Sequence, residues 1–203
     1  MNEKYSDTLV QRVMKKVEEL KLWQLKNDKS GFENVYKEVL RDVESLPECK
    51  EKQSALADVL MRGWWWLPGK KNDALYERIS NAAMEGKNEE VMSFIVSRED
   101  SNVYGGARIE FIRDKQIPRL QKAGFIKTLG REWFWLGHYL FRDGKKDEGR
   151  AAYAEAEKVL QDGNAYRSLV PFALKLEEEL SVRYKDAVKE RYIIVLPQRN
   201  SAL

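Results

Sequence analysis

The stretch that decides the fold covers residues 127–162 and reads KTLGREWFWLGHYLFRDGKKDEGRAAYAEAEKVLQD. Apolar residues recur every three or four positions on each side of a polar turn at residues 143–146, which is the spacing of one face of an α-helix. Gly144 lies in that turn, where a glycine readily takes the left-handed conformation that closes a helix. The stretch is therefore predicted to form two amphipathic helices joined by a tight turn.

Proline, glycine and short polar runs divide the rest of the chain into further segments of helical length. None of these segments alternates as a half-buried strand does. Ser30, Asn72 (or Asp73) and Asn88 are expected to cap helices, because such side chains accept hydrogen bonds from the first N–H groups. Pro118 is expected to kink its helix or to start a new one. The predicted helices span residues 5–25, 30–46, 48–66, 72–85, 88–96, 107–122 and 165–191.

A glycine–lysine turn recurs between the predicted helices, at residues 69–74, 86–90 and 144–149. In each copy the glycine is expected to take the left-handed position, and acidic residues begin the next helix, where they interact favourably with its dipole. The recurrence predicts stacked antiparallel helical hairpins. The fold class is therefore predicted to be all-α, in a single domain over residues 1–203.

Composition excludes several classes of protein. One cysteine and one histidine rule out a disulfide framework, a zinc site of clustered cysteines and a pair of histidine ligands. No apolar run approaches the roughly 20 residues that cross a bilayer, and the first residues lack the apolar core of a signal peptide. The net charge of +3 is too small to argue for or against nucleic acid. We therefore expect a cytoplasmic, non-enzymatic protein with no cofactor or metal.

Residues 130–162 resemble a tetratricopeptide repeat (TPR), whose first helix follows the pattern W-x2-L-G-x2-Y and whose second helix carries spaced small and aromatic residues. The matching residues are Trp133, Leu136, Gly137, Gly144, Gly149, Tyr153 and Ala156, with Leu140 in place of the first aromatic residue. The resemblance implies a TPR-like array with irregular members. The alternative is an irregular helical bundle built around one such hairpin.

A second unit, residues 56–87, resembles the repeat less well. Arg62 stands where the repeat has a buried leucine. The positions that fit are Gly63, Trp66, Ile79 and Ala82.

The resemblance implies a groove along the first helices that holds a peptide or helix of a partner protein. Carried over by position, the groove residues are Arg131, Phe134, His138 and Arg142, with Trp64 as their counterpart in the weaker unit. The two arginines suggest an acidic segment or a carboxylate in the partner. Reversing both charges is expected to abolish binding and to leave helicity intact.

Three adjacent tryptophans, Trp64, Trp65 and Trp66, cannot all face one core, because successive helical positions are about 100° apart. At least one is expected to be partly exposed or to lie at a second interface, which leaves a helix contact, a ligand surface and a homodimer open. The alternative function is a nucleic-acid-binding or transcription-regulatory helical protein. An enzyme that uses carboxylates in a helical cavity has less support.

Overall fold

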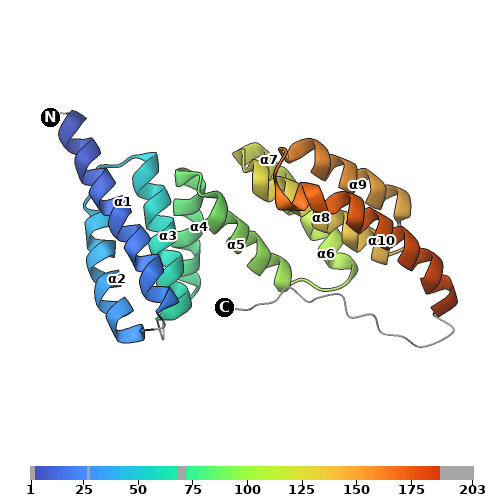
Figure 1. Ribbon diagram of the computed structural model, residues 1–203, viewed down its shortest axis with the longest axis horizontal. Helices are drawn as coiled ribbons and strands as arrows, with labels where there is room; N and C mark the ends of the chain where they lie inside the picture. Colours follow the sequence, from blue (N-terminus) through green and yellow to red (C-terminus); the bar gives the residue numbers. More distant parts are fainter. Residues whose placement is uncertain (1–2, 27, 68–71, 188–203) are drawn as a thin grey trace. The chain divides into compact units, whose positions relative to one another are not determined.

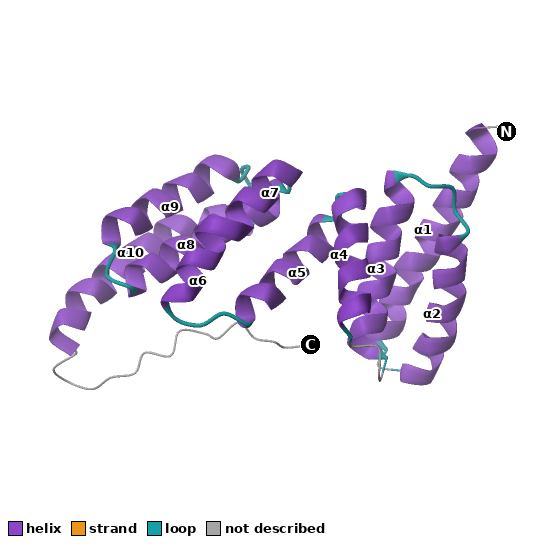
Figure 2. Cartoon of the chain, turned by 180° about the vertical axis from the view of Figure 1, so that it is seen from behind, coloured by secondary structure: helices purple, strands orange, loops and turns teal. Residues whose placement is uncertain are grey.

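The computed structural model shows a protein built from helices (Figure 1, Figure 2). It describes residues 3–26, 28–67 and 72–187, with side chains between residues 10 and 180, and in these ranges it contains no strand. The predicted all-α class is confirmed, with adjacent helices packed antiparallel as hairpins. The helices are α1 (Glu3–Leu25), α2 (Lys29–Glu44), α3 (Lys50–Trp66), α4 (Asp73–Gly86), α5 (Glu89–Ser101), α6 (Gly106–Phe111), the π-helical turn η1 (Ile112–Gln116), α7 (Ile117–Ala123), α8 (Ile126–Arg142), α9 (Lys146–Val159) and α10 (Ala165–Ala187).

The chain divides into two compact units. Unit 1 consists of Met1–Tyr104 and Arg119–Thr128, and unit 2 consists of Gly105–Pro118 and Leu129–Leu203. Unit 1 therefore contains α1 to α5, and unit 2 contains α6, α9, α10 and most of α8. The single domain expected from the sequence stays a prediction, because two compact units can belong to one domain.

Capping residues place most of the helix starts where the sequence predicts them. Asn72 Oδ1 accepts a hydrogen bond from the Leu75 N–H at 2.8 Å, and Asn88 Oδ1 accepts one from the Val91 N–H at 3.0 Å. The Ser30 prediction is wrong, because Asp28 caps α2 by accepting the Gly31 N–H at 3.0 Å. The predicted end of α5 at residue 96 is also too early, since this helix continues to Ser101.

Pro118 lies in the first turn of α7, as the second of the two alternatives predicts, and α7 follows directly on the π-helical turn η1. Proline has no N–H to donate, and its ring clashes with the carbonyl four residues earlier in a regular α-helix. The N–H of Ile117 donates to the carbonyl of Ile112, five residues back, so the helix is wider just before the proline. The helix then continues as α7.

Two copies of the glycine–lysine turn differ in which residue is left-handed. Gly144 has a φ of 82°, as predicted. In the other described turn Lys87 has a φ of 52°, so the prediction for Gly86 is wrong. Gly86 is needed for packing instead, because a Cβ there would lie 2.2 Å from the backbone nitrogen of Ser54 in α3. Residues 69–71 of the remaining copy lie outside the described residues.

In unit 2, α8 and α9 approach closely at a pair of glycines. A Cβ on Gly137 would lie 3.2 Å from the carbonyl oxygen of Gly149, and a Cβ on Gly149 would lie 3.2 Å from that of Gly137. Tyr153 is fully buried beside this contact and packs against Phe134 and Phe141. The small residues let the helices approach, and the aromatic residues fill the space beside them.

Candidate functional site

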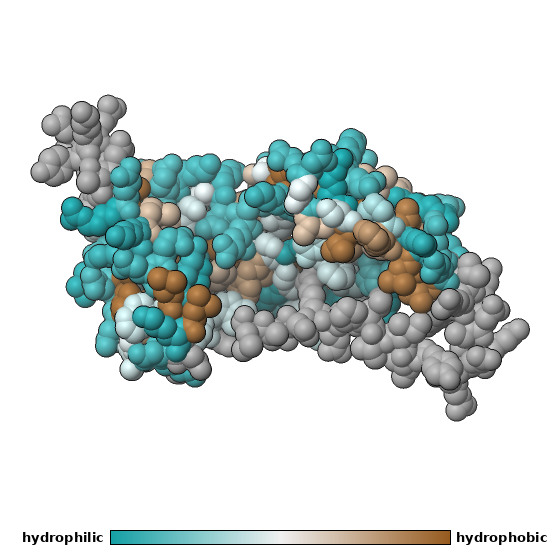
Figure 3. All heavy atoms as spheres, in the orientation of Figure 1, coloured by the Kyte–Doolittle hydropathy of each residue, from teal (hydrophilic) through white to brown (hydrophobic). Residues whose placement is uncertain are grey.

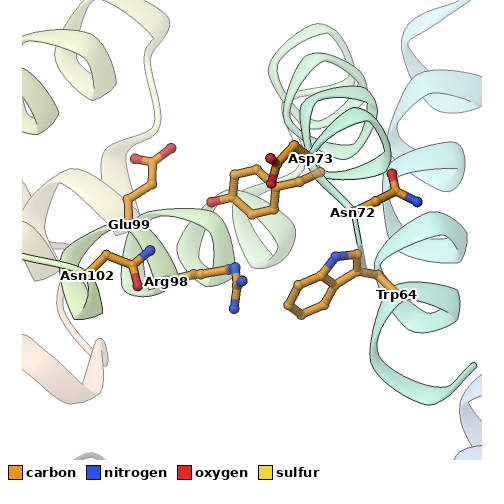
Figure 4. A pocket seen from close by; sticks show the side chains of 7 residues that line it. Trp64, Asn72, Asp73, Arg98, Glu99 and Asn102 are labelled. Carbon is orange, nitrogen blue, oxygen red and sulfur yellow. The ribbon is translucent and has the colours of Figure 1, made fainter. Parts of the chain in front are cut away.

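A small cavity of about 170 Å³ in unit 1 is a candidate site for a ligand group (Figure 4). It lies between the last turn of α3, the first turn of α4 and the last turn of α5. Its lining residues are Trp64, Asn72, Asp73, Tyr76, Arg98, Glu99 and Asn102. We call this cavity the Trp64 pocket.

Aromatic rings form one side of the Trp64 pocket. The indole of Trp64 is 3% exposed and lies 6.4 Å from the Tyr76 ring and 5.7 Å from the Phe94 ring, centroid to centroid. Trp65 is 50% exposed and packs on the same Phe94 at 5.3 Å. Trp66 faces another helix, where it meets Phe32 of α2. The expectation that the three tryptophans cannot share one core is thereby confirmed.

Arg98 supplies the positive charge of the Trp64 pocket. Its guanidinium carbon lies 4.4 Å from the centroid of the Trp64 ring and 5.8 Å from that of Tyr76, so the cation is attracted by the electron-rich faces of both rings. Within the described residues the Arg98 guanidinium makes no hydrogen bond and no ion pair. Its N–H groups are therefore available to a ligand, and its position is held by the rings (Figure 4).

Of the other charged and polar residues of the pocket, Glu99 and Tyr76 form hydrogen bonds with neighbouring residues, whereas Asp73 forms no ion pair with a described residue. Glu99 receives two hydrogen bonds from Arg119, at 2.8 and 3.2 Å, which offset its charge. Asp73 is exposed in the first turn of α4, and no described residue forms an ion pair with it. The Tyr76 hydroxyl donates to the carbonyl of Ile95 at 3.1 Å. Burial, together with the nearby Glu99, raises the pKa of Tyr76 to about 12, so this hydroxyl is neutral at physiological pH.

The groove residues predicted on α8 lie in unit 2, and three of the four are buried. Phe134 is in the core cluster, where it meets Tyr153 of α9 and Tyr166 of α10. Arg131 is buried with its guanidinium 2.9 Å from the carboxylate of Glu132. Only Arg142 is exposed.

His138 is buried against the last helix. Its Nδ1 lies 2.5 Å from a carboxylate oxygen of Glu177, which belongs to α10. Because α10 also supplies Tyr166 to the cluster around Phe134, this helix packs on the face of α8 that the sequence assigns to a groove. Binding of a partner by the four α8 residues stays a prediction. The structure places Trp64 in unit 1, apart in the chain from those four residues.

Arg98, Asp73 and Tyr76 are site residues that sequence reasoning missed. They come from two helices and meet Trp64 only through the packing of α3, α4 and α5. No spacing in the sequence connects them. The one available signal is Trp64 itself, whose excess of aromatic neighbours predicts an interface without naming the other side.

The rest of the described surface shows no feature that points to a ligand as clearly as the Trp64 pocket does. Figure 3 shows apolar side chains as separate areas in a mostly hydrophilic surface on the face that it draws. Within the described residues, no cluster of three or more His, Cys, Asp or Glu side chains is placed to hold a metal ion, and no helix is long and apolar enough to span a membrane. Comparisons with protein-family models, curated proteins and solved structures find no match to this chain. Function is therefore argued from the site.

Proposed function

We propose that this protein is a non-enzymatic interaction module that binds a segment of a partner protein at the Trp64 pocket. The observation that carries the proposal is the guanidinium of Arg98 stacked on Trp64, next to the half-exposed indole of Trp65. Tryptophan and arginine are the residue types on which binding energy concentrates at protein interfaces. A rigid stack also lowers the entropic cost of ordering a long side chain when the partner binds.

The size of the pocket supports a side chain as the bound group. Pockets for cofactors and drug-sized ligands are on the order of 300–1,000 Å³. The Trp64 pocket is smaller, at about 170 Å³, and open to solvent along Asp73 and Asn102. A pocket of this size accommodates one or two side chains of a peptide whose remainder lies on the surface around it.

The helical architecture supports the same function. Antiparallel hairpins, and the Gly137–Gly149 contact between α8 and α9, are the arrangement that the resemblance to a tetratricopeptide repeat implies for residues 130–162. Proteins of that architecture use surfaces built from several helices to hold partner segments. We assign the binding surface to α3, α4 and α5, and not to α8, because α10 packs on the predicted face of α8.

The proposal is tested by selecting a library of random seven-residue peptides for binding to the full chain. Recovered peptides are then titrated, by fluorescence anisotropy, against wild type and Trp65→Ala. We expect Trp65→Ala to weaken binding about tenfold or more, as truncation of a central aromatic residue does. Leu22→Ala is the matched control, since Leu22 is an exposed apolar residue of α1 in the same unit.

Two results would refute the proposal. One is a library that yields no peptide above background. The other is a set of peptides whose affinity is the same for wild type, Trp65→Ala and Leu22→Ala. Circular dichroism of each variant shows that a loss of binding is not a loss of helix.

A further inference from the structure

We infer that the Trp64 pocket recognises a carboxylate of the partner peptide, with Arg98 as the residue that binds it and Asp73 as the residue that limits its affinity. The inference rests on the proposed function and adds the chemical class of the bound group. It does not depend on the arginines of α8.

The geometry of Arg98 favours a carboxylate. A guanidinium presents a planar fork of N–H donors that matches the two oxygens of a carboxylate. In this pocket the guanidinium carbon is 4.4 Å from the Trp64 centroid, so one face of the group is covered by the indole. Stacking leaves the edge with the N–H donors open, and no described residue accepts from it. A carboxylate that approaches this edge forms hydrogen bonds without breaking one to a described residue.

The other charges of the pocket do not compete for Arg98. Glu99 is the nearest carboxylate along the chain, yet both of its oxygens accept from Arg119. Tyr76 is also committed, because its hydroxyl donates to the carbonyl of Ile95. Arg98 is therefore the pocket's cation without a partner among the described residues.

A cationic ligand fits the same pocket less well. The faces of Trp64 and Tyr76, to which a ligand cation would be attracted, are already occupied by the guanidinium of Arg98. A second cation would have to displace that group and would also meet the charge of Arg119, which pairs with Glu99 at the pocket wall. Like charges at such distances oppose each other.

Asp73 allows the charge of the ligand to be tested, because removing the Asp73 charge changes the affinity for acidic and for basic peptides in opposite directions. Its carboxylate lines the same pocket as Arg98 and is exposed (Figure 4). It repels a carboxylate ligand and attracts a cationic one. Removing its charge therefore strengthens the binding of an acidic peptide, whereas removing the charge of Arg98 weakens it. A cationic ligand would reverse both signs.

The experiment uses peptides recovered by the library selection, synthesised in four forms. The acidic side chains are kept or replaced by their amides, and the C-terminus is a free carboxylate or a carboxamide. Each form is titrated against wild type, Arg98→Gln and Asp73→Asn. Arg12→Gln and Glu85→Gln are the matched controls, since both residues are exposed in unit 1 and neither lines the pocket.

For the form that carries the recognised carboxylate we expect Arg98→Gln to weaken binding about tenfold, the size of a lost charge-assisted hydrogen bond. Asp73→Asn should strengthen it about two- to fivefold, the size of a solvent-exposed charge interaction. The form in which that carboxylate is replaced by an amide should bind wild type, Arg98→Gln and Asp73→Asn with equal affinity. Comparing the form without acidic side chains with the form without a C-terminal carboxylate shows which of the two carboxylates is recognised. Either source supports the inference.

Three outcomes would overturn the inference. Recovered peptides that bind equally well in all four forms need no carboxylate. Equal affinity of the acidic form for wild type and Arg98→Gln removes Arg98 from recognition. Basic peptides that bind more weakly to Asp73→Asn show a cation site. In each case binding that still depends on Trp65 leaves the proposed function standing, whereas failure to recover any peptide refutes both.

Discussion

The hairpins α3/α4 and α8/α9 each carry a glycine in the C-terminal half of their first helix, but the two glycines face different neighbours. A Cβ on Gly137 would lie 3.0 Å from the Tyr153 ring, in the other helix of its own hairpin. A Cβ on Gly63 would lie 2.5 Å from the ring of Tyr36, which belongs to α2. The same residue type at the same motif position therefore closes one hairpin in unit 2 and joins two hairpins in unit 1.

The difference between Gly137 and Gly63 shows how much a small residue in a helical repeat predicts about packing. It predicts that another helix comes close, and it does not say which one. The contact that brings α3 and α4 together is at Gly86, against the backbone of Ser54. The poor match of residues 56–87 also has a physical basis. Arg62, at a position where the repeat has leucine, is buried and lies 3.0 Å from the Asp58 carboxylate.

The largest expected effect tests the buried charge of α8. In Arg131→Glu a buried carboxylate replaces a cation that pairs with Glu132, which is itself 0% exposed. Removing one member of a buried pair costs about 3–5 kcal/mol. We expect the free energy of unfolding, measured by urea denaturation, to fall by about that amount. Reversing both Arg131 and Arg142 should then affect folding as well as binding, contrary to the expectation from sequence.

Arg142→Glu is the matched control for this prediction, because Arg142 is exposed on the same helix. Surface substitutions of this kind usually change stability by less than about 0.5 kcal/mol. If the two reversals cost the same, the pair of Arg131 with Glu132 does not contribute to the stability of unit 2.

The next effect tests which helix each glycine serves. Gly149→Ala places a Cβ 2.5 Å from the Phe141 ring, and Gly63→Ala places one 2.5 Å from the Tyr36 ring. Overpacking costs about 1–3 kcal/mol, and the better helix propensity of alanine offsets roughly 1 kcal/mol of it. We expect both variants to unfold at lower urea concentrations than wild type.

Rescue by a smaller neighbour sharpens the comparison. Adding Phe141→Leu should reduce the loss of stability caused by Gly149→Ala, and adding Tyr36→Leu should reduce the loss caused by Gly63→Ala. Each double-mutant cycle should therefore be nonadditive in the free energy of unfolding. Gly106→Ala is the control, since no heavy atom lies within 4 Å of a Cβ there. Strict additivity in the Gly63–Tyr36 cycle would contradict the contact between α3 and α2.

A smaller effect separates the half-buried Tyr76 of unit 1 from the buried Tyr153 of unit 2. The Tyr76 hydroxyl donates to Ile95, whereas the hydroxyl of Tyr153 has no hydrogen-bond partner among the described residues. A typical hydrogen bond contributes about 1 kcal/mol, and a buried polar group without a partner carries a desolvation cost. We expect Tyr76→Phe to destabilise by about 1 kcal/mol and Tyr153→Phe to leave stability unchanged or raise it. Thermal unfolding of both variants measures the difference, and equal losses would contradict it.

Helix positions were accessible from the sequence because periodicity and caps are local. Asn72 and Asn88 act as predicted, and the turn at Gly144 has its expected conformation. The exceptions are also local in cause. Asp28 precedes Ser30 and takes the capping role, and α4 continues through Gly86, so the left-handed residue that closes this helix is Lys87.

The site was much less accessible, because burial of a helix face depends on which distant helix packs against it. Nothing in the spacing of α8 says that Glu177 of α10 lies against His138. In the same way Trp64 was identified as unusual, but Arg98 stacks on it only because α5 packs beside α3. Contacts between residues far apart in the sequence decide both surfaces.

A last effect, which is confined to alkaline solution, tests the environment of the pocket by pH. Burial raises the pKa of Tyr76 to about 12 from its ordinary value of 10.0, so the folded state holds this proton more tightly than the unfolded chain does. The resulting stabilisation is complete below pH 10 and is lost as the pH rises towards 12. Wild type should therefore lose stability across this window more steeply than Tyr76→Phe, in urea unfolding at pH 9, 10.5 and 11.5. Tyr104→Phe, at an exposed tyrosine, controls for the loss of one phenol. Parallel curves for wild type and Tyr76→Phe would mean that solvent reaches the Tyr76 hydroxyl, and the pocket wall would then be more open than the structure shows.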